Sequence, residues 1–218
     1  MLTRLPRLPL ALLFSSALSI AFVLARASVT GRPGYGFLLW NLTLAWIPYV
    51  LARLIAARAR KEGGTVQLMA LGLAFIGFLP NAPYIVTDLM HLRWQTEDAP
   101  HWFDALMLAS FAWSGLTLGI ASLRITADVV KARVGSRASA GYVGIVSVLT
   151  AFGIYLGRFV RLNTWDAAVH PFRVARHVLA PLVHPTTHMR AWTFTIAFAA
   201  LFLAAYVSVH RRTEEQKQ

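Results

Sequence analysis

The chain has 218 residues, of which 57% are hydrophobic and 14% are charged, whereas soluble domains average roughly half and about a quarter, so an ordinary soluble domain is excluded. Cysteine is absent, which excludes disulfides, thiolate metal sites and cysteine nucleophiles. The net charge of +12 could indicate nucleic acid, but Lys and Arg stand between apolar blocks, where they suit topology signals and contacts with anionic headgroups. We therefore expect membrane lipids, and no nucleic acid, as partners.

Six segments contain no Asp, Glu, Lys or Arg and are long enough to cross a bilayer, for which a helix needs about 20 residues. A helix is expected because backbone polar groups in hydrocarbon must be satisfied within the segment. The sequence therefore predicts an all-α integral membrane bundle of about six transmembrane helices. Residues 1–210 form its single domain, and 211–218 form a short cytoplasmic tail. The predicted spans cover residues 8–25, 33–52, 63–87, 105–123, 138–157 and 191–209.

The first predicted span, 8–25, has two interpretations. Arg4 and Arg7, the apolar run after them and the small-residue pattern at 25–27 resemble a cleavable signal peptide. However, the apolar run is longer than the roughly 7–15 residues of a typical signal-peptide core. This favours a helix that is retained in the mature protein.

Basic residues between the spans predict the orientation, because cytoplasmic segments of membrane proteins are enriched in Lys and Arg. With the N-terminus inside, thirteen of the 21 basic residues fall on the cytoplasmic side, so both termini are predicted in the cytoplasm. The last external loop, about 158–190, nevertheless holds five arginines, and the external loop between the third and fourth spans is acidic. We expect ion pairs between these two loops.

The segment 78–91, at the outer end of the third span, is the richest in residues that could carry chemistry. Pro80 and Pro83 remove backbone donors and clash with the preceding turn, so the helix should kink or break there. Asn81 is then expected to cap a second half-helix.

On that half-helix, Asn81, Tyr84, Asp88 and His91 are predicted to lie close to one face. Asp88 or His91 could act there as a general base. In the alternative interpretation, the helix is merely kinked and both residues emerge into water, near the end of the span where a charge costs less.

Two GxxxG motifs, Gly115 with Gly119 in the fourth span and Gly153 with Gly157 in the fifth, allow helix backbones to approach closely. We interpret them as contacts between the fourth and fifth spans of one chain. The alternative is a homodimer through these faces.

Arg158 and Arg161, at the outer end of the fifth span, are three residues apart and are predicted to share a helix face. Either could pair with Asp88 or hold an anion such as a phosphate or carboxylate.

Three residues just beyond have a structural alternative to a binding role. Asn163 and Asp166 have the spacing of a capping box for a following helix, and Trp165 suits the aromatic belt of a membrane interface.

The rest of the last external loop is divided by Pro171, Pro181 and Pro185, and its longest uncharged piece is too short to span. We expect an interfacial amphipathic or re-entrant segment. His184 and His188 have the spacing of a helical metal pair, but Pro185 separates them and no acidic ligand is adjacent, so neither a metal site nor a cofactor is predicted.

The predicted topology brings these residues to one external face. Asn41, in the outer half of the second span, joins them and needs a hydrogen-bond partner in lipid, for which Asn81 or Tyr84 is a candidate. Asp88 and His91 are the catalytic candidates of this face. The predicted binding residues are Asn41, Asn81, Tyr84, Asp88, His91, Arg158, Arg161, Asn163, Trp165 and Asp166.

Four segments carry a family resemblance: 41–48, 80–92, 102–104 and 153–166. The longest two read Pro-Asn-Ala-Pro-Tyr-Ile-Val-Thr-Asp-Leu-Met-His-Leu and Gly-Ile-Tyr-Leu-Gly-Arg-Phe-Val-Arg-Leu-Asn-Thr-Trp-Asp. Through them the chain resembles a bacterial family of polytopic membrane proteins known as domain of unknown function 1361. The resemblance implies a bacterial inner-membrane location and supplies no activity.

Three functions are compatible with these patterns. The first, which we favour, is a non-catalytic membrane component that binds a lipid, an anion or a partner protein through its outer polar face. The second is an enzyme for a lipid-linked or anionic substrate, with Asp88 or His91 as base and Arg158 or Arg161 holding the anion. The third is a small-solute transporter, but the first, fourth and sixth spans offer only Ser and Thr as polar groups.

Overall fold

The computed structural model describes residues 7–32, 34–61, 64–94, 99–162 and 166–215. These residues form helices and contain no strand, which confirms the predicted all-α class. η1 is a 3₁₀-helix and η2 a π-helical turn. The elements are α1 (Arg7–Thr30), α2 (Phe37–Arg60), α3 (Thr65–Phe78), α4 (Asn81–Tyr84), η1 (Ile85–Trp94), α5 (His101–Val134), α6 (Ser136–Tyr155), η2 (Leu156–Val160), α7 (Asp166–Val169), α8 (Pro171–Val183) and α9 (Met189–Glu215).

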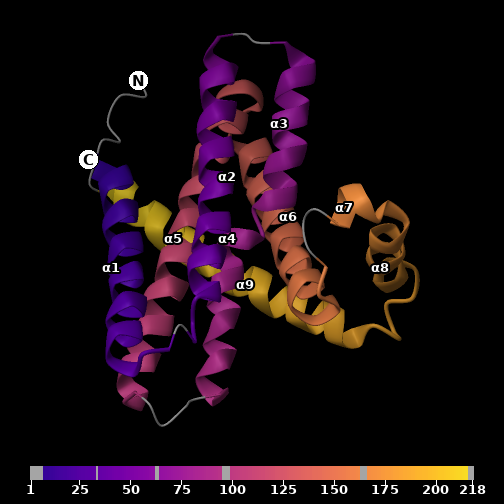
Figure 1. The fold of residues 1–218 in the computed structure, drawn as a ribbon. Coiled ribbons are helices and arrows are strands. Elements are labelled where there is room, and N and C mark those ends of the chain that lie inside the picture. The colour runs from indigo at the N-terminus through magenta and orange to yellow at the C-terminus, as the bar shows by residue number, and fades with distance from the viewer. Residues whose placement is uncertain (1–6, 33, 62–63, 95–98, 163–165, 216–218) are drawn as a thin grey trace.

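Six helical stretches of the described chain are long and apolar enough to cross a membrane, as predicted. They are α1, α2, α3 continuing through η1, α5, α6 with η2, and α9. Successive stretches run in opposite directions, so α1 begins and α9 ends at the end of the bundle that also holds the α2–α3 and α5–α6 connections (Figure 1). This arrangement suits two termini on one side of a membrane; which side they occupy stays a prediction.

The helices extend beyond the predicted spans. The prediction stopped at charged residues, but a helix that leaves hydrocarbon continues into water. α5 has 34 residues against the predicted 105–123, and its last turn carries Lys131 and Arg133, which suit the negative end of the helix dipole. It ends at Gly135, whose φ of 105° favours glycine, and α6 begins at the next residue.

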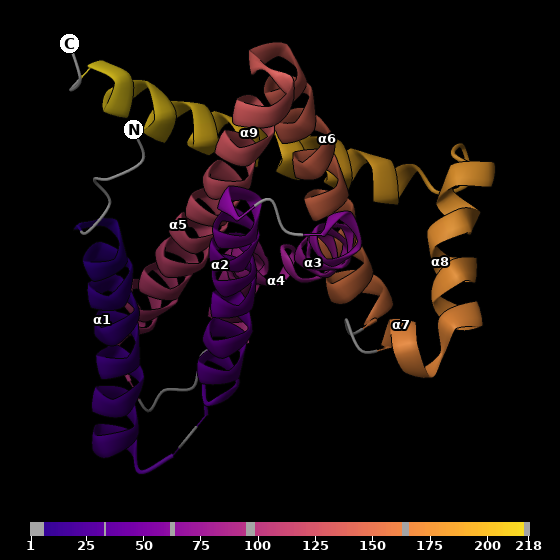
Figure 2. The ribbon, with the colours of Figure 1, turned by 90° about the horizontal axis from the view of Figure 1, so that it is seen from above.

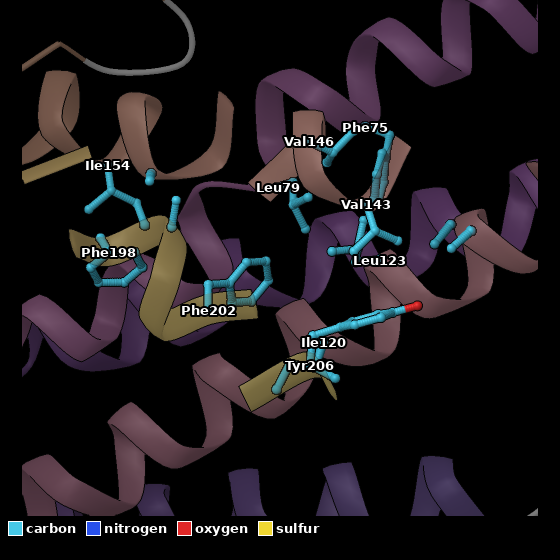
Figure 3. Packing of buried hydrophobic residues seen from close by; sticks show 14 of the residues in the cluster. Phe75, Leu79, Ile120, Leu123, Val143, Val146, Ile154, Phe198, Phe202 and Tyr206 are labelled. Carbon is cyan, nitrogen blue, oxygen red and sulfur yellow. The ribbon is translucent and has the colours of Figure 1, made fainter. Parts of the chain in front are cut away.

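α5 is the central helix, because 67% of its most apolar stretch is buried against 28–39% for the other five spans. One group of buried side chains joins it to α1, α2 and η1, and a second joins it to α3, α6 and α9. Figure 3 shows the second group, to which α3 contributes Phe75, α6 contributes Val146 and α9 contributes Phe202. Outward-facing side chains such as Phe14 and Ile196 are also apolar, as suits a surface against acyl chains.

The third span is broken, as predicted. α3 ends at Phe78, α4 makes a single turn, and the chain then continues as the 3₁₀-helix η1. The predicted capping role of Asn81 is wrong: no side-chain bond caps α4, and the Asn81 Nδ2 donates backward to the Phe78 carbonyl at 3.0 Å. The side chain thus satisfies a carbonyl left over at the end of α3.

The GxxxG motif of α5 packs against this broken segment. A Cβ at Gly115 would overlap the Ala82 carbonyl oxygen, and one at Gly119 would lie 3.1 Å from the Pro83 ring. Absence of these side chains lets the α4 backbone lie directly on α5.

The GxxxG motif of α6 packs against the same segment from another side. A Cβ at Gly153 would lie 2.6 Å from Cγ of Pro80, and one at Gly157 would lie 3.3 Å from the Tyr84 ring. The four glycines therefore form a cradle for residues 80–85, which corrects our interpretation of them as contacts between the fourth and fifth spans. A homodimer through these faces stays an untested prediction, and their use within the chain does not support it.

α7 and α8 lie beside α6, on the side of the bundle away from α1 (Figures 1 and 2). α8 has 13 residues, too few to span. Val174 and Val178 face the protein, while Phe172, Arg173 and Leu179 are exposed. This division suits the predicted interfacial segment.

Candidate functional site

A buried ion pair lies at the centre of the predicted polar face. The Nη2 of Arg158 donates to Oδ1 of Asp88, and the Asn41 Nδ2 donates to Oδ2 at 2.8 Å. Asp88 is only 1% exposed, so it does not emerge into water as the alternative interpretation held. Asn41 thus finds its partner in Asp88, and not in Asn81 or Tyr84 as predicted.

Arg158 is also bound from its other sides. Its Nε donates to the Thr87 hydroxyl at 2.8 Å, and its guanidinium stacks 4.2 Å above the Tyr84 ring. Its Nη1 lies 3.4 Å from the His91 Nε2. Its donors and its planar face are thus engaged by residues of the same chain.

The 3₁₀ geometry of η1 explains why these partners converge. Side chains three residues apart eclipse one another in a 3₁₀-helix. Asp88 and His91 therefore stand one above the other, with Oδ1 of Asp88 3.8 Å from Nε2 of His91. Thr87 stands three residues after Tyr84 in the same way, and its hydroxyl donates to the Tyr84 carbonyl at 2.6 Å. One arginine can then reach all four residues.

The end of the fifth span differs from the prediction. η2 widens the helix into a π-turn that the Arg161 N–H closes on the Leu156 carbonyl, and the Leu162 N–H donates to the same carbonyl at 3.1 Å. Arg161 ends it in the left-handed conformation, at φ 61° and ψ 40°, and its side chain is exposed. Arg158 and Arg161 therefore do not share a helix face. The prediction that they would is wrong because it assumed regular α-helical turns at this end of the span.

His91 lies at the rim of this cluster. Its side chain is 36% exposed, and its ring packs against Phe37 at the start of α2, with centroids 4.9 Å apart. It is the most accessible titratable member of the cluster.

A cavity of about 420 Å³ lies next to the ion pair, between α2, the α3–α4 break, α6 and α8. Its polar lining comes from Asn41, Asn81 and Tyr84, whereas Asp88 and Arg158 lie behind this wall and outside the lining. The remaining lining is apolar or small: Trp40, Leu44, Ile76, Gly77, Pro80, Leu149, Phe152, Gly153, Leu156, Gly157, Leu162, Val174 and Val178.

The predicted site residues thus divide into two sets. Asn41, Asn81 and Tyr84 line the cavity, and Asp88 and His91 of η1 form the ion-pair cluster behind it with Arg158 of η2. Asp166 begins α7 and is not among the residues that line the cavity. Asn163 and Trp165 lie outside the described residues.

A second buried ion pair was not predicted. Arg26 of α1 donates from Nε to Oδ1 of Asp104 at 2.7 Å and from Nη2 to Oδ2 at 3.3 Å, with exposed fractions of 5% and 0%. The Arg26 guanidinium also lies 4.7 Å from the centre of the Tyr35 ring. Burial raises the pKa of Tyr35, and the Asp104 carboxylate raises it further.

The signal for this pair was present in the sequence. A charge at the end of an apolar span commonly has a partner, and Arg26 and Asp104 stand at the ends of such spans. Asp104 therefore pairs with α1 and not with the last external loop. The contacts of α1 with the bundle support its retention, which stays a prediction.

Among the residues that the structure describes, no three His, Asp or Glu side chains come together in a group that could hold a metal ion.

The chain belongs to the family described as "Protein of unknown function (DUF1361)", whose profile matches residues 40–205. The match confirms the predicted resemblance and includes the cavity and the Asp88 cluster, while Arg26 lies before it. No curated protein and no solved structure matches the chain. The family description states no activity, so any function must be argued from the geometry.

Proposed function

We propose that this protein binds an amphiphilic, lipid-like ligand in the cavity between α2, α4 and α6, in the outer half of a bacterial inner membrane. The observation that carries the proposal is the cavity itself. Its volume of about 420 Å³ lies within the range of small-molecule sites, roughly 300–1,000 Å³. A mostly apolar wall with a few polar groups on one side matches a ligand with an apolar body and one polar end.

The ion-pair cluster supports this function as a scaffold. Asn41 and Tyr84, which line the cavity, are each held from behind: Asn41 by its bond to Asp88, and Tyr84 by the stacked Arg158. Gly157 packs against the Tyr84 ring as well. Polar groups that are fixed before binding lose little freedom when a ligand arrives.

The same geometry disfavours the enzyme hypothesis. A general base must come within hydrogen-bond reach of the proton that it removes. Asp88 is 1% exposed, both of its carboxylate oxygens accept hydrogen bonds, and it lies outside the cavity lining. Arg158 is likewise not part of the lining, and its donors contact Thr87, His91 and Asp88.

The proposal is tested by filling the cavity. Gly77 lines it, and a Cβ built there meets no atom within 4 Å, so Gly77→Trp should place an indole in the ligand's space without disturbing α3. Gly72→Trp is the matched control, because Gly72 lies in the same helix, is equally open and is not part of the lining.

Each protein is purified in mild detergent, and its bound lipids are identified by native mass spectrometry. The wild type and Gly72→Trp should carry a lipid that Gly77→Trp lacks. If all three proteins carry the same lipids, the cavity is not the binding site.

A further inference from the structure

We propose that the polar end of this ligand is an uncharged hydrogen-bonding group, a hydroxyl or an amide, that contacts Asn41 and Tyr84. This inference rests on the proposed function and specifies its ligand class. It follows from the hydrogen-bond state of Asn41 and Tyr84, two of the polar residues at the cavity wall.

Asn41 offers an acceptor. Asn41 lines the cavity, its Nδ2 donates to Asp88, and no described residue donates to its Oδ1. A ligand group that meets it must therefore carry a hydrogen-bond donor.

Tyr84 offers a hydroxyl. Its ring lies between Arg158 and Gly157, and within the described chain its hydroxyl has no hydrogen-bond partner. A phenol both donates and accepts, so Tyr84 can complement the acceptor atom of the same ligand group. A hydroxyl or an amide has both a donor and an acceptor and can satisfy the two residues together.

The charges near the cavity are unavailable to a ligand. The Arg158 guanidinium is bound to Asp88 and Thr87 and covered by the Tyr84 ring, and the Asp88 carboxylate is buried behind Asn41. An anionic or cationic headgroup would therefore lose its hydration in the cavity without gaining a counter-charge, which is costly.

The test uses four probes with an 18-carbon chain: monoolein with hydroxyls, oleamide with an amide, oleyl sulfate with a negative charge, and 1-octadecene with no headgroup. The protein is placed in phosphatidylcholine nanodiscs. Because the chain has no cysteine, Leu44→Cys in the cavity lining supplies a single thiol whose maleimide labelling reports occupancy.

Monoolein and oleamide should protect this thiol from the maleimide at concentrations more than about tenfold lower than the concentration of oleyl sulfate that gives the same protection. In the same background, Tyr84→Phe removes one hydrogen bond but keeps the ring under Arg158. It should weaken the binding of monoolein by about fivefold. Tyr155→Phe is the control, since Tyr155 is an aromatic residue of α6 outside the cavity lining.

The remaining outcomes separate the two proposals. If 1-octadecene protects as well as monoolein, the cavity binds an acyl chain whatever its headgroup, and if oleyl sulfate protects best, the cavity binds an anion. Either result refutes the proposal of an uncharged headgroup, while the proposed function stands. If no probe protects the thiol at any concentration, the proposed function itself fails.

Discussion

Asp88 and Arg158 form a buried ion pair that depends on single neighbouring residues. Taking two charges out of water is expensive, and the cost is recovered only when further hydrogen bonds complete both groups. Here Asn41 completes the carboxylate and Thr87 the guanidinium. The pair is therefore sensitive to the loss of any one partner.

Asp88→Asn or Arg158→Met should each lower the free energy of unfolding by about 3–5 kcal/mol, because each leaves a buried charge without its partner. The double variant should lower the free energy of unfolding by less than the sum of the two single losses. Unfolding by SDS in mixed micelles measures all three. Arg161→Met is the control: its exposed side chain should contribute less than roughly 0.5 kcal/mol. Single variants as stable as the wild type would contradict the pair's structural role.

At this scale the sequence predicted local relations better than distant ones. Tyr84, Asp88 and His91 could be grouped because they are neighbours along one helix. The bond between Asn41 and Asp88, 47 positions apart, and the pair of Arg26 with Asp104, 78 apart, depend on how helices are arranged in space. No spacing rule within one helix specifies such contacts.

Among the elements, the broken third span shows both the reach and the limit of such reasoning. Pro80 and Pro83 predicted the break, because proline acts on its own backbone. The helices against which the broken segment packs could not be predicted, because a motif of small residues permits close packing without specifying which element packs there. The four glycines of α5 and α6 turn out to hold one short segment between them.

Gly115→Ala should therefore destabilise the bundle by about 1–3 kcal/mol, since its methyl group would overlap backbone that cannot rotate away. Gly144→Ala, in α6 with no atom within 4 Å of the new Cβ, should instead add up to about 1 kcal/mol of helix stability. The same SDS titration measures both. Equal effects at the two positions would argue against the cradle.

At the scale of the molecule, hydropathy was sufficient for the number of spans, because each crossing must satisfy its own backbone. Charge asymmetry gave an orientation that the fold alone does not test. The central place of α5 follows from side-chain packing, which no single span encodes.

The orientation predicts opposite labelling of two exposed positions in a chain that has no cysteine. Thr186→Cys, between α8 and α9, should react with a membrane-impermeant maleimide in intact cells. Ser136→Cys, at the start of α6, should react only after the cells are permeabilised. The reverse pattern would invert the orientation and move the cavity to the cytoplasmic half.

The pair of Arg26 with Asp104 bears on how the protein is made. The arginine emerges from the ribosome 78 positions before the carboxylate, so α1 cannot be locked until α5 has entered the bilayer. This end of the bundle is therefore closed late in synthesis and over a long stretch of chain, the kind of contact that slows folding. Until α5 is inserted, α1 lies beside the translocation machinery or in lipid, and Arg26 has not yet met the carboxylate of Asp104.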